Sequence, residues 1–446
     1  MITDKFSGQH SSASLEAVCA YEEAVDNVAA HRPAAAPALA AALAASPEFV
    51  AAHALKGFAA VILARSETMM AAREAALAAH AAAKGRTLSE HETAMLDALD
   101  FAVKGELLAA ARRLDLHLGL HPRDFLCLKL SHILRFMSGD LGGMLKTTGL
   151  VLNDWSPQTP GYGFVLGCHA FGLEEAGDYA AAETTGRAAL RHEPADAWGL
   201  HAVSHVFEMD GRTKEGIQWL DATRSVWTQC NNFTFHMGWH LCLFHLAQGR
   251  HDLALAVYDA DVRPVSTEDF RDVVNAVSLL WRMRQEKVNV GQRWQELHAI
   301  AQRRAVDTTL MFTSLHHLLT MIAVGDRAGA QSVADEIAQR ARSGEGDQAR
   351  VAAGVGTGLA QALLGAGGSA TDLPRLAASV ADIGGSHAQR DVFYRTLALI
   401  AADRGDRQSA SLLAAQRRQF RRDDRFAALA LARLNFVLQA ETRAVA

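Results

Sequence analysis

One feature recurs along this chain of 446 residues and limits its fold more than any other: a glycine followed by a short turn and a helix-forming run. The glycine returns at intervals of 34 to 40 residues, with one interval of 76 that corresponds to two repeats. Glycine adopts the left-handed conformation that ends many helices, and a helix that restarts at once makes a helical hairpin. Self-similarity at this period predicts about ten stacked hairpins. The repeating glycines are Gly105, Gly139, Gly177, Gly211, Gly249, Gly325, Gly365 and Gly405.

The segment 163–196 fits the tetratricopeptide pattern closely. Gly177 lies at the turn, and the small residues Ala182 and Ala189 lie where the two helices of a hairpin must touch. Pro194 ends the second helix because proline cannot continue a helix. Alternating apolar and polar runs, the mark of strands, are absent from the sequence. We therefore expect an all-α fold, an α-solenoid of tetratricopeptide-like hairpins.

Two helix starts carry local signals. Thr87 and Glu90 have the spacing of a capping box, and Ser46-Pro47 resembles an N-cap followed by a first-turn proline. Both pairs predict that a helix begins directly after them.

We expect one superhelical domain over residues 1–446. It would consist of N-terminal hairpins in 10–150, histidine-rich central hairpins in 151–260 and C-terminal hairpins in 268–446. Because a superhelix of about ten hairpins can curl, its late repeats can cover the concave groove of its middle ones.

The composition excludes several classes of protein. The net charge of -5 is small for this length and no polybasic block appears, so we expect neither a nucleic-acid partner nor a membrane partner. The first ten residues lack the pattern of a secretory signal. The five cysteines are odd in number and form no C-x-x-C pair, which is typical of reduced thiols in a cytoplasmic protein. Homo-oligomerisation is left open.

Histidines at one-turn spacing mark two successive hairpins. Residues three or four apart share a helix face, so two stripes form. In tetratricopeptide hairpins the first helix lines the concave surface. Counting back from Gly211 and Gly249 places the first stripe, His236 and Trp239 there, and His240 beside them. Counting back from Gly139 in the same way places Lys129 on the concave surface of its own hairpin. The first stripe consists of Trp198, His201, His205 and Glu208, and the second of His236, Trp239 and His240.

Three interpretations of these stripes remain open. A single histidine on a helix is more often a core group bonded to a nearby carbonyl than a ligand. A divalent metal held by His201, His205 and His236 is the second interpretation, although no cofactor is required and Ala202 stands where a metalloprotease has its glutamate. The third is proton transfer by His205 beside Glu208.

The chain resembles the tetratricopeptide repeat protein 38 family over nearly its full length. The segments that carry the resemblance are LKLSH (128–132), DAWGLHAVSHVFEM (196–209), HMGWHLCLF (236–244), VGQRW (290–294) and GGSHAQRDVF (384–393). The resemblance implies an α-solenoid and implies no particular reaction. It points to Lys129, His132, Trp198, His201, His205, Glu208, His236, Trp239, His240, Arg293, Gln389, Arg390 and Asp391. The chain departs from the family pattern at His317 and His387, so neither residue is expected to be essential.

These observations predict a binding protein whose histidine-rich concave pocket holds a peptide segment or a small anionic ligand. In this hypothesis Gln389, Arg390, Asp391 and Arg293 close over the groove, and Arg390 binds a carboxylate or phosphate with two hydrogen bonds. The alternatives are an enzyme that uses His205 and Glu208, with or without a metal, and a scaffold without a special pocket.

Overall fold

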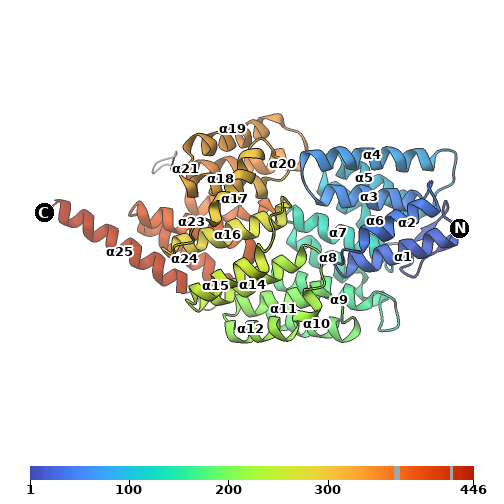
Figure 1. The fold of residues 1–446 in the computed structure, drawn as a ribbon, viewed down its shortest axis with the longest axis horizontal. Helices are drawn as coiled ribbons and strands as arrows, with labels where there is room; N and C mark the ends of the chain where they lie inside the picture. Colours follow the sequence, from blue (N-terminus) through green and yellow to red (C-terminus); the bar gives the residue numbers. More distant parts are fainter. Residues whose placement is uncertain (366–371, 422–424, 446) are drawn as a thin grey trace. The chain divides into compact units, whose positions relative to one another are not determined.

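The computed structural model describes residues 1–365, 372–421 and 425–445, and most of this described part is helical (Figure 1). The expected all-α fold is therefore confirmed. One short antiparallel ladder near the N-terminus joins β1 (Ile2–Thr3) to β2 (Gln9–His10), which the sequence did not indicate. None of the helices in the described residues is long and apolar enough to cross a lipid bilayer.

The chain forms two compact units, and the first contains residues 1–206 and 222–234 (unit 1). Its helices succeed one another from blue to green in Figure 1, and neighbours such as α1 and α2, α3 and α4, or α9 and α10 pack together as hairpins. The helices of unit 1 are α1 (Leu15–Ala29), α2 (Ala35–Ala45), α3 (Val50–Ile62), α4 (Ser66–Ala83), α5 (Glu90–Ala102), α6 (Leu107–Leu118), α7 (Phe125–Met137), α8 (Leu141–Val151), η1 (Leu152–Asp154), α9 (Tyr162–Glu175), α10 (Tyr179–His192), the larger part of α11 (Ala197–Met209), and α13 (Arg224–Trp227).

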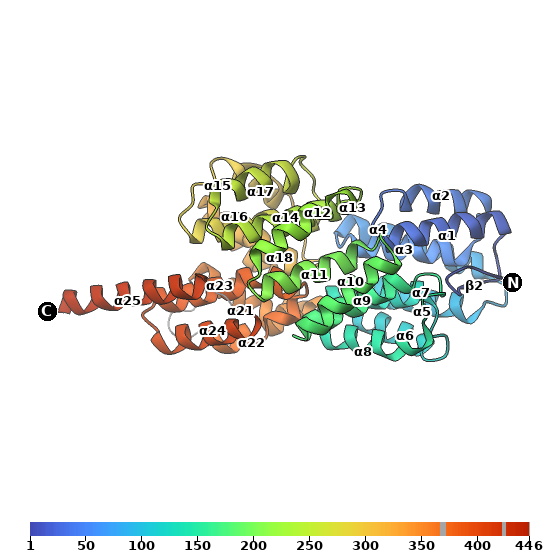
Figure 2. The same ribbon diagram turned by 90° about the horizontal axis from the view of Figure 1, so that it is seen from below.

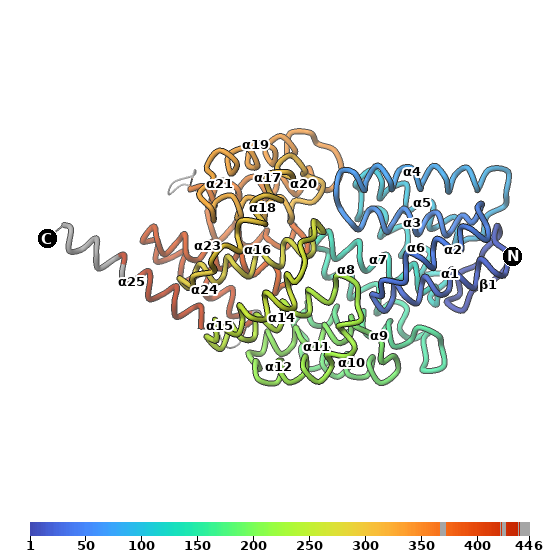
Figure 3. The backbone as a smooth tube through the Cα atoms, viewed as in Figure 1, coloured from blue at the N-terminus to red at the C-terminus, as the bar shows by residue number. Residues whose placement is uncertain are grey.

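Unit 2 contains residues 207–221 and 235–446, and it is built in the same way (Figures 2 and 3). Here α18 packs on α19 and α23 on α24, while α16 contacts both α18 and α23. Its helices are α12 (Thr213–Ala222), α14 (Phe233–Ala247), α15 (His251–Val257), η2 (Tyr258–Val262), α16 (Phe270–Gln285), α17 (Arg293–Arg303), α18 (Met311–Val324), α19 (Arg327–Ser343), α20 (Gly346–Val351), η3 (Ala352–Gly356), α21 (Thr357–Leu364), α22 (Leu373–Ala378), η5 (Val380–Ile383), α23 (His387–Asp403), α24 (Arg407–Phe420) and α25 (Arg425–Val445). The expectation of one domain over the whole chain stays a prediction.

The eight repeating glycines all have the left-handed conformation, with φ between +67° and +85°. Each lies within three residues of the end of a helix, at or near the turn that the sequence predicted. Three further hairpins have no such glycine. Their turns place His31, Ala64 and Lys287 at φ values of 56°, 49° and 61°, a conformation that side chains other than glycine seldom adopt.

The segment 163–196 is the tetratricopeptide hairpin that the sequence predicted. Its two helices are α9 and α10, and Ala182 and Ala189 are fully buried. A Cβ atom on Gly163 would lie 2.8 Å from the backbone nitrogen of Glu193, so only glycine permits this approach. Small residues therefore set the spacing of the helices, as expected.

Both predicted helix starts are wrong by a few residues. The capping box of α5 consists of Ser89 and Glu92, two residues beyond the predicted pair. Ser46 ends α2 instead of beginning a helix, and α3 begins after Phe49. The segment TLSEHE contains two overlapping capping-box patterns, Thr87 with Glu90 and Ser89 with Glu92. The sequence alone does not decide which of the two begins the helix.

Candidate functional site

The first histidine stripe lies on α11 and begins at a capping aspartate. Asp196 accepts a hydrogen bond from the backbone N–H of Gly199 at 3.1 Å and so starts the helix. Trp198, His201 and His205 then follow on one face, as the spacing predicted, and all three are buried. The last turn of α11 belongs to unit 2 and carries Glu208.

Lys129 and His132 of α7 lie against Trp198. The Nζ atom of Lys129 is 5.2 Å from the centre of the Trp198 ring, a cation–π distance. The indole N–H of Trp198 donates to Nε2 of His132 at 3.0 Å. Burial, reinforced by the charge of Lys129, lowers the pKa of His132 to about 3. His132 is therefore a neutral acceptor that orients the tryptophan.

His201 and His205 are hydrogen-bonded to each other in an aromatic environment. Their Nε2 atoms are 2.8 Å apart, and Nδ1 of His205 lies 3.3 Å from a carboxylate oxygen of Glu174. The ring of Phe171 stacks on His201 with centroids 5.4 Å apart, and Phe233 meets the same ring edge-on at 5.2 Å. Each imidazole is thus held in a fixed orientation.

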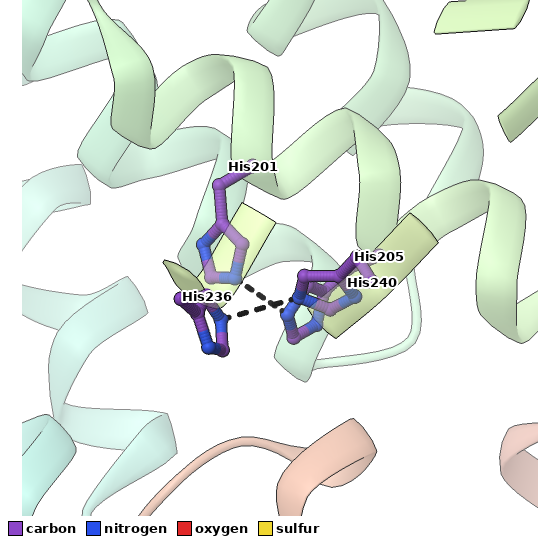
Figure 4. A group of neighbouring side chains, drawn as sticks. All are labelled: His201, His205, His236 and His240. Carbon is purple, nitrogen blue, oxygen red and sulfur yellow. Dashed lines mark hydrogen bonds between the residues drawn. The ribbon is translucent and has the colours of Figure 1, made fainter. Parts of the chain in front are cut away.

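The second stripe, on α14, is built in the same way. The Nε2 atoms of His236 and His240 are 3.2 Å apart, and Nδ1 of His240 lies 3.0 Å from Glu208. Trp239 stacks on His236 and donates its indole N–H to Ser278 at 3.1 Å. Figure 4 draws the two histidine pairs with the hydrogen bond inside each pair.

The predicted groove residues are buried where the repeat phase had led us to expect open space. Among these stripes the largest exposed fraction is 8%, for Trp198 and His236. The carboxylates found beside the imidazoles are Glu174 for His205 and Glu208 for His240. Proton transfer between His205 and Glu208 stays a prediction, as does the metal set His201, His205 and His236, which draws on both units.

The late motif GGSHAQRDVF begins α23. Ser386 caps the helix, and Gln389 returns its side-chain oxygen to the backbone N–H of Ser386 at 3.1 Å. The buried guanidinium of Arg390 donates to the carbonyl of Gly385. Arg293 lies elsewhere: its Nε donates to Asp259 at 2.8 Å on a partly exposed surface. Within unit 2, the described hydrogen-bond partners of Arg293 are Asp259 and the carbonyl of Val290, and neither is one of the predicted site residues.

Two helices of the C-terminal hairpins, α16 and α23, contact each other within unit 2, and the covering of the histidine-rich groove by late repeats stays a prediction. Trp281 of α16 donates its indole N–H to Thr396 of α23 at 2.9 Å. Arg282 donates to the carbonyl of Ala388 at 2.7 Å and lies 3.7 Å from the carboxylate of Asp391. These contacts lie on the buried side of both helices.

A cavity of about 90 Å³ lies in unit 2, and arginines dominate its wall. A water needs roughly 10–15 Å³ of such space, so the cavity is large enough for a small anion. We call it the arginine cavity. Its lining residues are Glu208, Gly211, Thr213, Leu243, Leu246, Ala247, Arg282, Glu286, Arg395, Arg417, Arg421, Arg425 and Phe426.

The carboxylates around the arginine cavity are shared between guanidinium groups. Asp391 lies 2.6 Å from Arg417 and 3.5 Å from Arg421, and Arg421 also lies 3.0 Å from Glu208. Glu286 lies 3.0 Å from Arg395 and 4.0 Å from Arg425. Among the described residues, five guanidinium groups line the cavity, and three carboxylates contact them.

The ionisation of these groups follows from burial and pairing. Burial alone would raise the pKa of Asp391, but the charges of Arg417 and Arg421 outweigh burial and lower it below the ordinary range. Burial lowers the pKa of Arg282 to about 9, although Asp391 opposes this. Asp391 is thus an anion and Arg282 a cation at neutral pH.

Sequence reasoning missed most of the arginine cavity. It identified Glu208 and Asp391 but none of the five arginines. Arg282, Arg395 and Arg425 come from three different helices, and arginine is common on helix surfaces. The basic run RRQFRRDDR at 417–425 was the one available signal.

Two comparisons with known proteins bear on this chain. No family model matches it. Among solved structures, a chain from the "Structure of Naa15/Naa10 bound to HypK-THB" is similar at 14% sequence identity with a TM-score of 0.24. The match covers 95% of this chain and 67% of that one. A TM-score this low supports no conclusion about function. The chain's own structure identifies it as an all-α helical-repeat protein.

Proposed function

We propose that this helical-repeat protein is a binding protein whose second unit holds a small anionic ligand, with a carboxylate or phosphate group, in the arginine cavity. The observation that carries the proposal is the set of five arginines that line one partly enclosed space. Guanidinium groups bind such anions with two parallel hydrogen bonds, and these charge-assisted bonds are the strong ones. Membership in the tetratricopeptide repeat protein 38 family is part of this proposal.

The position of the arginines supports an anion more than a long apolar ligand. Arg282 and Arg395 are nearly fully buried, and burying positive charge is costly even where carboxylates pair with it. An anion that enters the cavity offsets this cost. The aromatic ring of Phe426, which Arg395 approaches to 4.2 Å, helps to keep the guanidinium in place.

The test is anion binding by calorimetry and thermal unfolding, with inorganic phosphate and citrate as probes and chloride at equal ionic strength as reference. Arg425→Gln should weaken binding about tenfold or more, because a hydrogen bond to a charged group contributes roughly 1.5–3 kcal/mol. Arg433→Gln is the matched control, since Arg433 is on the same helix and pairs with Asp403 outside the cavity. Absence of saturable binding, or equal losses in both variants, would contradict the proposal.

An acid–base enzyme is the second candidate. The observation in its favour is that Glu208 lines the arginine cavity and also contacts Nδ1 of His240, so that a carboxylate holds an imidazole near the bound anion. We expect His240→Gln to abolish any turnover of phosphate monoesters or carboxylic esters while anion binding persists. If the wild-type protein does not exceed the uncatalysed rate on either class, this candidate is wrong for them.

A further inference from the structure

Unit 1 contains a second group of polar side chains, which the proposed function does not use. It joins the start of α5, the end of α6 and the start of α7. All four members are at least 95% buried, and one nitrogen, oxygen or sulfur atom of each lies within 4.8 Å of the others. We call this group the α5–α7 cluster. Its members are His91, His117, Asp124 and Cys127.

Asp124 is the centre of the α5–α7 cluster. One carboxylate oxygen, Oδ1, caps α7 by accepting from the backbone N–H of Cys127 at 3.1 Å. The other, Oδ2, lies 2.6 Å from Nδ1 of His91 and 2.8 Å from Nε2 of His117. The thiol Sγ of Cys127 lies 3.9 Å from the same Nδ1 of His91. The cap therefore fixes the orientation of the carboxylate toward both imidazoles and the thiol.

The geometry points to a structural zinc site, in which His91, His117, Asp124 and Cys127 bind one Zn²⁺ ion. Two imidazole nitrogens, one carboxylate oxygen and one thiolate are ligands that zinc commonly takes in four-coordinate sites. Tetrahedral ligands at zinc distances lie roughly 3.3–3.6 Å apart. Three of the separations, at 2.6, 2.8 and 3.9 Å, lie on both sides of this range, and all four ligand atoms lie within 4.8 Å of one another.

Charge balance supports zinc over an empty cluster. One thiolate and one carboxylate carry two negative charges, which the ion neutralises, so the filled site buries no net charge. Without a metal, the carboxylate of Asp124 in the fully buried interior must be balanced by a protonated imidazole. In the zinc-bound site, four bonds to the ion take the place of the ion pair between the Asp124 carboxylate and a protonated imidazole.

The surroundings of the cluster give an independent observation. The hydroxyl of Tyr21 and Nε2 of His91 are buried, and within the part of the chain that the structure describes neither has a hydrogen-bond partner. The ring of His10 lies 5.2 Å from Tyr21 and 5.3 Å from His91. Buried polar atoms are normally satisfied, so these two atoms mark a region whose polar groups are not all accounted for by the described protein atoms.

The first experiment measures metal in the full-length protein purified without chelators. We expect one zinc per chain and, in protein produced with cobalt instead of zinc, the near-ultraviolet charge-transfer band of a thiolate bound to Co²⁺. This band identifies a site with a cysteine ligand, because imidazole and carboxylate ligands of Co²⁺ do not give it. A protein that neither retains nor takes up either metal would overturn the inference.

Substitutions then locate the thiolate. Cys127→Ser should abolish the charge-transfer band, and His117→Gln should lower the zinc content to well below one per chain. Cys168→Ser is the matched control, since Cys168 is another fully buried cysteine of unit 1 outside the cluster. Loss of the band in the control variant, or its persistence in Cys127→Ser, would show that a different cysteine binds the metal.

X-ray absorption of the wild-type zinc protein keeps the inference testable even if Cys127→Ser does not fold. We expect one sulfur neighbour at about 2.3 Å and three lighter neighbours at about 2.0–2.2 Å. A spectrum with no sulfur neighbour, or with two or more, would contradict the assignment.

Discussion

At the scale of single residues, burial determines the charge of the groups around α11. Asp196 caps this helix and is fully buried. Burial raises the pKa of Asp196 to about 7, even though the charge of Lys129 opposes the rise. Because the carboxyl binds a proton more tightly in the folded protein than in the unfolded chain, its contribution to stability falls as the pH rises from about 4 to about 7.

Asp196→Asn should therefore stabilise the protein at alkaline pH. Asparagine keeps an oxygen that accepts from Gly199 but does not ionise. At pH 8 we expect a gain on the order of 2–4 kcal/mol in the free energy of unfolding, shrinking toward zero near pH 4. Denaturant unfolding across this pH range measures it. Asp335→Asn at an exposed site on α19 should change stability by less than about 0.5 kcal/mol at every pH, and a gain at Asp196 independent of pH would refute the explanation.

The bond between Trp198 and His132 is a second residue-scale feature. His132→Leu leaves the buried indole N–H of Trp198 without its acceptor, which should cost about 1–3 kcal/mol. In a Trp198→Phe background the same substitution should cost at least 1 kcal/mol less, because no donor is left. A double-mutant cycle of unfolding free energies gives this difference. Additive losses would mean that the hydrogen bond contributes nothing beyond packing.

At the scale of elements, the turns show what the sequence could predict. A glycine that recurs at the repeat period indicated eight hairpins, because its backbone conformation is rarely available to other residues. His31, Ala64 and Lys287 adopt the same conformation with no signal in the sequence, since packing of the adjoining helices outweighs the local preference there.

Gly177 offers a direct comparison with a glycine inside a helix. A Cβ atom would meet nothing within 4 Å at Gly177 or at Gly149, so sterics do not distinguish them. The φ of +85° at Gly177 makes Gly177→Ala destabilising by about 1–2 kcal/mol. Gly149 lies within α8, where alanine should stabilise by up to about 1 kcal/mol. Thermal unfolding should show midpoints that shift in opposite directions, and two shifts of equal sign would contradict this account.

The candidate sites were predictable only in part, for a physical reason. Helical spacing placed Trp198, His201 and His205 on one face of α11, which the structure shows. Spacing within one helix does not tell which groups from other helices meet that face. The four ligands of the α5–α7 cluster and the five arginines of the arginine cavity come from several helices each, so no local pattern connects them.

At the scale of the whole molecule, the two units should respond to different ligands. Zinc removal should speed amide hydrogen exchange in α5, α6 and α7 of unit 1, because the ion joins their ends. Phosphate should slow exchange in α23 and α24 of unit 2, whose arginines face the cavity. Exchange followed by mass spectrometry resolves both effects. If each treatment changed both units equally, global stabilisation and not local binding would be the cause.

The division of the chain into units 1 and 2 determines where the chain can be cut without removing part of a unit. The boundary after Val206 falls within helix α11. Unit 1 also includes the later segment 222–234, which carries Cys230 and Phe233. A gene truncated at that boundary would lack the last turn of α11 and the Phe233 ring, which stacks 4.5 Å from His31. Each unit is therefore assembled from two separate stretches of sequence, and no single cut in the chain separates unit 1 from unit 2.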